Sequence, residues 1–296
     1  MRYILSTKDL KLQDVENIMN LSRYFKEGGK KEVKASALLM FMEPSTRTKL
    51  SFERACRNLG IDVFSIDLST SSIQKGESFM DTIRTVEAIG MDVLIFRVPF
   101  TLFPEKELIN NTKVCLINAG DGANQHPTQA LIDLFTIKDR FGDLKNLRIA
   151  YIGDILHSRV FRSSVHLLRM YGTEVGVCGP KTLIPSDIKN LGVYHVWDRV
   201  EEAIGWADVC IWLRLQRERQ KEQFIPSERD YFNQFGLNKS RYEKVKYFMH
   251  PGPVNRDVDI EGDLVYSEKS LILEQVKNGV FIRMAVLSYV LQSRTS

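Results

Sequence analysis

The chain has few cysteines and no motif that would join them. Its 296 residues include four, Cys56, Cys115, Cys178 and Cys210, which lie far apart and form no CxxC pair. The last three stand in apolar runs of strand type, where a cysteine is most often a buried free thiol. The spacing therefore argues against a disulfide framework and against a structural zinc site.

Long apolar runs and a strong charge of one sign are also missing. No window approaches the roughly 18 apolar residues of a membrane span, and the first ten residues lack the apolar stretch of a secretion signal. We therefore expect a cytoplasmic protein that does not enter membranes. The net charge is +4, from 41 basic and 37 acidic residues. This excess is too small to predict nucleic-acid binding, and a few arginines that bind small anions explain it equally well.

Internal repeats and low-complexity tracts are absent, and the length allows two domains of ordinary size. Short β-rich runs alternate with amphipathic segments, which is typical of parallel sheets flanked by helices. In the first half, strands are expected at 36–42, 62–66, 92–96 and 114–117, with helices at 46–59, 78–89 and 127–140. In the second half, strands are expected at 148–154, 174–178 and 208–213, with helices at 158–170 and 199–205.

This alternation predicts an α/β protein with two doubly wound, Rossmann-like parallel-sheet domains joined by a helix near 127–141. A last helix, about 268–292, is expected to return to the first domain. Segment 214–246 does not fit the pattern, because it is highly charged, contains Pro226 and Gly236 and shows little periodicity. For this segment we expect a mobile loop.

Polar residues follow the first strand of the chain, where open parallel sheets bind their ligands. Strand 36–42 runs into Glu43 and then into a helix. The residues at the start of this helix are Ser45, Thr46, Arg47 and Thr48. Ser45 or Thr46 is expected to cap the helix, and the N–H groups at its positive end suit a phosphate. Taken alone, the cluster is explained equally well as an ordinary capped helix with a solvent-facing arginine.

Two further clusters follow neighbouring strands of the first half. Arg97 directly follows one strand, and a glycine-rich segment after the next leads to His126 and Gln129. Pro127 suits the first helical turn, so the histidine and the glutamine lie three apart on one face of it. A lone histidine here is more often a cap than a catalyst, but arginines at the same edge favour a functional role.

The second half repeats this pattern with different charges. Arg159 begins a helix after strand 148–154, and Arg214 and Gln216 follow strand 208–213. Two arginines at two strand ends suit the two carboxylates of a molecule such as aspartate.

Two loops complete the set of candidates. Lys75 lies in the polar segment 69–78, where a cationic lid and an ordinary solvated lysine are the alternatives. Residues 250–253 read His-Pro-Gly-Pro, and the prolines restrict the backbone. The carbonyls of Gly252 and Pro253 are then able to accept hydrogen bonds from an amine, although a simple turn explains the motif too.

Together these motifs resemble those of the aspartate/ornithine carbamoyltransferases over nearly the whole chain. Residues 45–53 are similar to the carbamoyl-phosphate signature of that family, and Arg97 and residues 126–129 match its other donor-site elements. The elements that resemble the aspartate branch are residues 75–78 (KGES), Arg159, residues 214–219 and residues 250–253 (HPGP).

The ornithine branch is the nearest alternative. It typically has a cysteine after the histidine of the late loop and a Ser-Met-Gly element, whereas here Pro251 follows His250 and no Ser-Met-Gly occurs. Some aspartate enzymes carry leucine where this chain has Gly252, a departure that we expect to matter little because the family contact is through the backbone.

The resemblance implies transfer of the carbamoyl group of carbamoyl phosphate to the α-amine of L-aspartate, the committed step of pyrimidine (UMP) biosynthesis. It implies that residues 1–130 with about 270–296 bind carbamoyl phosphate and that residues 131–269 bind aspartate. Glu43 would pair with an arginine rather than act as a base, and the departing phosphate would accept the proton. An ornithine or other amino-acid carbamoyltransferase and a non-catalytic scaffold remain the alternatives.

The resemblance also assigns a role to each candidate residue. Donors to the carbonyl oxygen would be Arg47, Thr48 and His126. Phosphate ligands would be Ser45, Thr46, Thr48, Arg97 and Lys75. Gln129 and the carbonyl of Pro253, with Gly252 beside it, would orient the carbamoyl NH₂. Aspartate ligands would be Lys75, Arg159, Arg214 and Gln216.

The assembly and partners are implied in the same way. The family forms a homotrimer in which Lys75, with Ser71, completes the active site of the neighbouring subunit. No metal or other cofactor is implied, since arginines supply the positive charge. The HPGP form of the late loop resembles bacterial enzymes that associate with dihydroorotase, which makes that enzyme a candidate partner.

Overall fold

The computed structural model describes residues 2–66, 78–102, 105–216 and 227–292, without the side chains of 105–107. The chain forms two compact units. Unit 1 comprises Met1–Phe135 and Lys277–Ser296, and unit 2 comprises Thr136–Val276. The chain passes from one unit to the other within helix α5 (Pro127–Phe141) and again within helix α10 (Ile272–Gln292).

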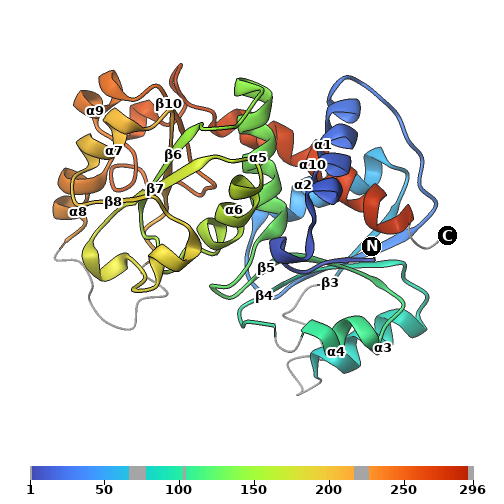
Figure 1. The fold of residues 1–296 in the computed structure, drawn as a ribbon. Coiled ribbons are helices and arrows are strands. Elements are labelled where there is room, and N and C mark those ends of the chain that lie inside the picture. Colours follow the sequence, from blue (N-terminus) through green and yellow to red (C-terminus); the bar gives the residue numbers. More distant parts are fainter. Residues whose placement is uncertain (1, 67–77, 103–104, 217–226, 293–296) are drawn as a thin grey trace. The chain divides into compact units, whose positions relative to one another are not determined.

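Unit 1 contains a five-stranded parallel sheet in the order β1-β5-β4-β2-β3. Its strands are β1 (Tyr3–Ile4), β2 (Ser36–Phe41), β3 (Asp62–Ile66), β4 (Val93–Val98) and β5 (Cys115–Asp121). Its other helices are η1 (Thr7–Asp9), α1 (Leu12–Lys26), α2 (Thr46–Asn58), α3 (Phe79–Ala88) and α4 (Glu105–Asn110). The central strands are apolar because helices cover both faces: α1, α2 and α10 lie on one face, and α3 and α4 on the other (Figure 1).

Unit 2 contains a second five-stranded parallel sheet, in the order β10-β9-β6-β7-β8. Its strands are β6 (Arg148–Gly153), β7 (Glu174–Cys178), β8 (His195–Trp197), β9 (Val209–Leu213) and β10 (Tyr247–Met249). Its other helices are α6 (Arg159–Met170), η4 (Lys181–Leu183), η5 (Ile188–Leu191), α7 (Val200–Trp206), α8 (Glu228–Phe235), α9 (Lys239–Lys244) and η7 (Gly262–Leu264). On one face Tyr151 packs edge-on against Phe161 of α6, and on the other Trp212 joins the core beneath α7 and α8.

The two parallel sheets with alternating helices confirm the predicted fold class. The return of the last helix to unit 1 is also confirmed. The Arg283 guanidinium lies 4.9 Å from the centre of the Phe52 ring, and the Tyr289 hydroxyl donates to Asp14 at 2.6 Å. The 21 residues of α10 begin at Ile272, slightly later than expected. No helix in the described residues is both long and apolar enough to cross a membrane.

All four cysteines are buried free thiols, which confirms the prediction for Cys115, Cys178 and Cys210. Burial raises the pKa of Cys56 to about 12 and that of Cys178 to about 12. Because the thiolate is the reactive form, these side chains stay protonated and inert near neutral pH.

The expected mobile loop over 214–246 is wrong for its second part, which holds α8 and α9. The side chains of Ser227 and Asn238 cap these helices, accepting N–H groups from the first turns at 3.0 Å each. The buried Arg241 of α9 donates to the carbonyl of Gly236, directly after α8, at 2.6 Å and pairs with Glu201 at 2.9 Å. Caps and one buried arginine hold helices too short to show a periodic apolar pattern. Residues 217–226 lie outside the described part.

Candidate active site

The carboxyl end of β2 leads into the start of α2, where the first candidate residues lie. Ser45 occupies the N-cap position, but the expected capping bond from its side chain is not formed. The first turn contains no acidic side chain, so its N–H groups and the helix dipole keep their positive potential. Thr46 and Arg47 are exposed, whereas Thr48 is 6 % exposed. This uncapped helix start suits a phosphate group.

Arg97 lies near the end of β4, paired in register with the last residue of β2. Its Nε lies 3.3 Å from Oε2 of Glu43, and the two side chains are 14 % and 20 % exposed. The N–H of this Nε is not aligned for a hydrogen bond, so the contact is an ion pair only. Nη1 donates to the carbonyl of Ala119 at 3.5 Å. Glu43 and the end of β5 thus hold the guanidinium at the carboxyl edge of the sheet.

His126 and Gln129 stand on the first turn of α5, where Pro127 is the first helical residue. His126 is 5 % exposed, and its carbonyl accepts the N–H of Gln129 at 3.0 Å. The Gln129 amide lies 2.8 Å from Oδ1 of the buried Asp133. Because an ionised carboxylate only accepts hydrogen bonds, the amide nitrogen faces Asp133 and the amide oxygen faces away from it.

In unit 2, one fully buried carboxylate joins the ends of β6 and β9. Asp154 directly follows β6, and its Oδ1 accepts the N–H of His157 at 3.1 Å and lies 2.9 Å from the ring Nδ1. Its Oδ2 accepts the N–H of Gln216 at 3.2 Å, and the Gln216 side chain donates to the carbonyl of His157 at 2.9 Å. Gln216 is therefore anchored to the loop that begins α6.

The two candidate arginines of unit 2 stand at these same strand ends. Arg159 is the first residue of α6 and is 6 % exposed. Ser158 caps this helix, accepting the N–H of Phe161 at 3.1 Å. Arg214 directly follows β9 and is half-buried. Both arginines thus lie at the carboxyl edge of the sheet, where open parallel sheets bind ligands.

The His-Pro-Gly-Pro loop follows β10 and is braced by its own histidine. Nδ1 of His250 accepts the N–H of Gly252 at 2.8 Å, and Nε2 lies 3.2 Å from Oδ2 of Asp259. Since a backbone N–H only donates, the ring proton sits on Nε2 and bonds to Asp259. Gly252 has a φ of 70°, which glycine adopts at least cost, and its peptide bond to Pro253 is cis.

Lys75 and Ser71 lie outside the described residues, so their roles stay predictions. Within the described residues, no group of three or more His, Cys, Asp or Glu side chains is arranged to hold a metal ion. The positive charge at the two sheet edges comes from the arginines and from the start of α2.

Comparison with known proteins agrees with this geometry. A family model for the carbamoyl-P binding domain of aspartate/ornithine carbamoyltransferase matches residues 2–139, and the model for the Asp/Orn binding domain matches residues 145–290. The chain belongs to this carbamoyltransferase family.

Curated and solved relatives cover almost all of this carbamoyltransferase. The aspartate carbamoyltransferase catalytic subunit of Aquifex aeolicus is 58 % identical over 98 % of this chain and 99 % of its own length. That of Ruminiclostridium cellulolyticum is 44 % identical over 98 % and 95 %. The catalytic subunit of aspartate transcarbamoylase from M. jannaschii superposes with a TM-score of 0.88 at 30 % identity, covering 100 % of both chains. The Trypanosoma cruzi enzyme in complex with carbamoyl phosphate gives a TM-score of 0.85 at 28 % identity, covering 96 % and 95 %.

Sequence reasoning missed the buried carboxylates that brace these carbamoyltransferase loops. They are Asp121, Asp133, Asp154 and Asp259, each 0 or 1 % exposed. A signal existed for two of them, because Asp121 and Asp154 each follow a glycine at the end of an apolar strand. Asp259 gave no local signal, since it accepts the N–H of Leu215, which is 44 residues away.

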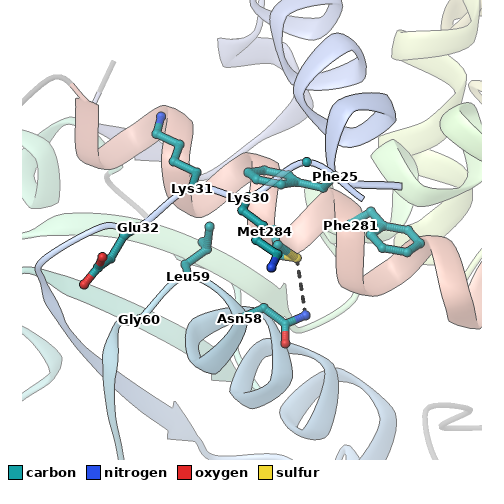
Figure 2. A pocket seen from close by; sticks show the side chains of 10 residues that line it. Phe25, Lys30, Lys31, Glu32, Asn58, Leu59, Gly60, Phe281 and Met284 are labelled. Carbon is teal, nitrogen blue, oxygen red and sulfur yellow. Dashed lines mark hydrogen bonds between the residues drawn. The ribbon is translucent and has the colours of Figure 1, made fainter. Parts of the chain in front are cut away.

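A pocket of about 510 Å³ in unit 1 is distinct from the candidate residues. Its apolar lining includes Phe25, Leu59 and Met284, and Lys30 reaches toward the Met284 sulfur and Asn58 (Figure 2). It lies at the end of α2, on the side of the sheet where the strands begin, because α2 starts at the carboxyl end of β2 and runs back. None of the described candidate residues lines it.

Proposed function

We propose that this chain transfers the carbamoyl group of carbamoyl phosphate to the α-amine of L-aspartate, giving N-carbamoyl-L-aspartate and phosphate. The observation that carries the proposal is the 58 % identity with the A. aeolicus aspartate carbamoyltransferase catalytic subunit, over 98 % of this chain. The candidate residues support it, because unit 1 offers a helix start suited to phosphate and unit 2 offers two arginines suited to carboxylates. The reaction is the committed step of pyrimidine (UMP) synthesis.

Residues of unit 1 hold and polarise the donor. The phosphate accepts hydrogen bonds from the first turn of α2 and from the side chains of Ser45, Thr46, Thr48 and Arg97, with Lys75. Arg47, Thr48 and His126 donate to the carbonyl oxygen, where negative charge develops during attack. Donors that are already in place before this charge develops lower the barrier, and removing one typically costs a hundredfold or more in rate.

The carbamoyl NH₂ group donates hydrogen bonds to two acceptors. One is the amide oxygen of Gln129, which the bond from its nitrogen to Asp133 directs away from that carboxylate. The other is the carbonyl of Pro253, in the loop that His250 braces at Gly252. Fixed acceptors orient the planar carbamoyl group and reduce the entropic cost of reaching the attack geometry.

Residues of unit 2 hold the acceptor. Arg159 and Arg214 each bind one carboxylate of aspartate, and Gln216 and Lys75 contribute to the same site. The bonds from Asp154 to the loops of His157 and Gln216 support this assignment, because they restrain the segments from which the two arginines project.

The bonding changes need no further reactant. The amine nitrogen forms a bond to the carbonyl carbon, the bond from that carbon to the phosphate oxygen breaks, and phosphate leaves with the electron pair. The nitrogen then loses a proton, which the departing phosphate accepts. Glu43 is not assigned as a base, because it is paired with Arg97.

We also propose a cytoplasmic homotrimer that works without a metal or other cofactor. In this trimer Lys75, with Ser71, completes the active site of a neighbouring subunit. Dihydroorotase is a further proposed partner, on the resemblance of the HPGP loop alone. Co-expression and sizing chromatography test it, and separate elution at micromolar concentration would leave the partnership without support.

A direct assay tests the reaction. The purified chain is incubated with carbamoyl phosphate and either L-aspartate, L-ornithine or no acceptor, and phosphate release and carbamoylated product are measured. Aspartate should be the preferred acceptor, because two arginines match two carboxylates. Equal or faster carbamoylation of ornithine would favour the ornithine branch, and no product with any acceptor would favour a non-catalytic scaffold.

A further inference from the structure

Asp121, the last residue of β5, is 1 % exposed, and its carboxylate accepts four hydrogen bonds. Oδ1 accepts from the side chain of Asn118 at 2.8 Å and from the N–H of Gln125 at 3.0 Å. Oδ2 accepts from the N–H of Leu102 at 3.1 Å and from the side chain of Asn124 at 3.0 Å. Four donors fill the acceptor capacity of the carboxylate, so the buried charge is satisfied by N–H groups.

Three of these donors come from two segments next to different candidate residues, and the fourth, Asn118, belongs to β5 itself. Two donors belong to the loop that leads to His126, and Leu102 belongs to the segment that follows Arg97. The loops also touch at Gly122, whose N–H donates to the carbonyl of Val98 at 3.0 Å. A β-carbon at this glycine would lie 3.1 Å from a backbone carbonyl carbon of the Arg97 segment, so the two backbones are already in close contact.

We propose that Asp121 is a positioning residue of the donor site, which fixes the loop that leads to His126 and the segment that follows Arg97 relative to each other. This inference rests on the proposed function, in which Arg97 binds the phosphate and His126 the carbonyl oxygen of one molecule. Asp121 acts through the spacing of those two groups and does not itself touch the substrate. A misplacement of about 1 Å lowers a rate by as much as a hundredfold.

The variant Asp121→Asn tests this role with the smallest change of shape. The new NH₂ group is expected to face Leu102 and Asn124, because the Asn124 amide can turn to accept from it. Asn118 cannot turn in this way, since its side chain also donates to the carbonyl of Leu5 and accepts the N–H of Gly120. The bond from the N–H of Leu102 is then lost.

The segment that follows Arg97 then loses its bond to this side chain, whereas the loop that leads to His126 keeps the bond from the N–H of Gln125. We expect kcat to fall roughly ten- to hundredfold and the Kd of carbamoyl phosphate, measured by calorimetry without aspartate, to rise. The KM for aspartate should stay nearly constant, because the proposed aspartate ligands of the described chain lie in unit 2.

Asp92 supplies a matched control on the opposite edge of the same sheet. Its Oδ2 accepts the N–H of Ser36 at 2.7 Å and the Ser36 hydroxyl at 3.1 Å, next to the starts of β2 and β4. Asp92→Asn should lower the melting temperature but leave kcat and the Kd of carbamoyl phosphate within about twofold. The positioning role is wrong if both variants lose activity alike, or if folded Asp121→Asn keeps both constants within about twofold.

A milder variant covers the case in which Asp121→Asn does not fold. Asn124→Ala removes one donor at a half-buried position and should lower kcat roughly three- to tenfold. An unchanged kcat in that variant would overturn the inference. The wild type separates the two proposals: if it carbamoylates no acceptor, the proposed reaction fails. Calorimetry with inorganic phosphate then still tests the role of Asp121. If Asp121 positions the donor site, the Asp121→Asn variant should bind phosphate more weakly than the Asp92→Asn variant.

Discussion

The two units offer anion-binding groups of different kinds at the carboxyl edges of their sheets. Unit 1 presents the uncapped start of α2, which carries Arg47, and Arg97, which is paired with Glu43. Unit 2 presents one arginine at the start of α6 and one directly after β9, each two residues from a backbone N–H that donates to the buried Asp154. A tetrahedral phosphate is matched by converging N–H and hydroxyl groups, whereas the planar fork of arginine matches a carboxylate. The difference between the edges therefore corresponds to two different substrates.

The largest expected effect is a recovery of activity when two inactive variants are mixed, and it tests whether one chain supplies the whole active site. Lys75→Ala and Arg47→Ala should each be inactive alone, and mixing them under conditions that exchange subunits should restore activity. A neighbour with an intact Lys75 then completes a site with an intact Arg47, up to about one site per mixed trimer. Persistent inactivity after exchange is verified by mass would place Lys75 in its own chain's site.

The next effect concerns the carboxyl edge of the unit 1 sheet, where the carbamoyl donor is proposed to bind. His126→Ala should lower kcat on the order of a hundredfold or more, because it removes one donor to the developing oxyanion. Phosphate affinity should be nearly unchanged, since the proposed phosphate ligands remain. Kinetics at saturating substrates and calorimetry with inorganic phosphate measure the two quantities. Normal turnover combined with lost carbamoyl-phosphate binding would show that the role assigned to His126 is wrong.

The smallest effect is confined to the edge where the strands of unit 2 begin. Burial disfavours the charge of Asp208, but bonds from Arg148 and Lys246 outweigh this and lower its pKa from 3.8 to about 2. A lowered folded-state pKa stabilises the fold fully above pH 4 and progressively less as the pH falls toward 2. Asp208→Asn should cost about 1 kcal/mol of unfolding free energy at neutral pH, after allowance for exposure of the pair.

Thermal or urea unfolding at pH 7, 5 and 3.5 measures this cost. The difference from wild type should be full at the two higher pH values and smaller at the lowest. The KM values for both substrates should not change, because Asp208 lies at the opposite edge from the candidate residues. A difference that grows as the pH falls would contradict the assigned pKa direction.

Most of the fold was predictable because its central strands are continuous apolar runs with helical segments between them. Strands β2 and β9, for example, are marked by SALLMF and VCIWL. The short elements β8, α8 and α9 were not predictable from periodicity. They have three to eight residues and are held by contacts that no local pattern reveals. Strand β8 pairs with β7, and side-chain caps and the buried Arg241 hold α8 and α9.

Of the candidate site, the sequence allowed us to predict only the residues whose side chains are proposed to bind substrate. Arg97, Arg159 and Arg214 each mark the end of a strand or the start of a helix, which the strand-end rule makes visible. The groups that brace them were not visible, because their partners come from distant parts of the chain. Asp259, for instance, joins Leu215 and His250 only once β9 and β10 are side by side.

The assignment of one substrate to each sheet edge is tested most directly by replacing one arginine at each edge with alanine. Arg97→Ala and Arg214→Ala are compared with wild type by steady-state kinetics, with each substrate varied at saturation of the other. Arg97→Ala should raise the KM for carbamoyl phosphate, and Arg214→Ala should raise the KM for aspartate far more than that for carbamoyl phosphate. Losing one charge-assisted contact costs about 1.5–3 kcal/mol, roughly ten- to hundredfold. Two variants that raise both constants by the same factor would contradict the assignment of one substrate to each unit.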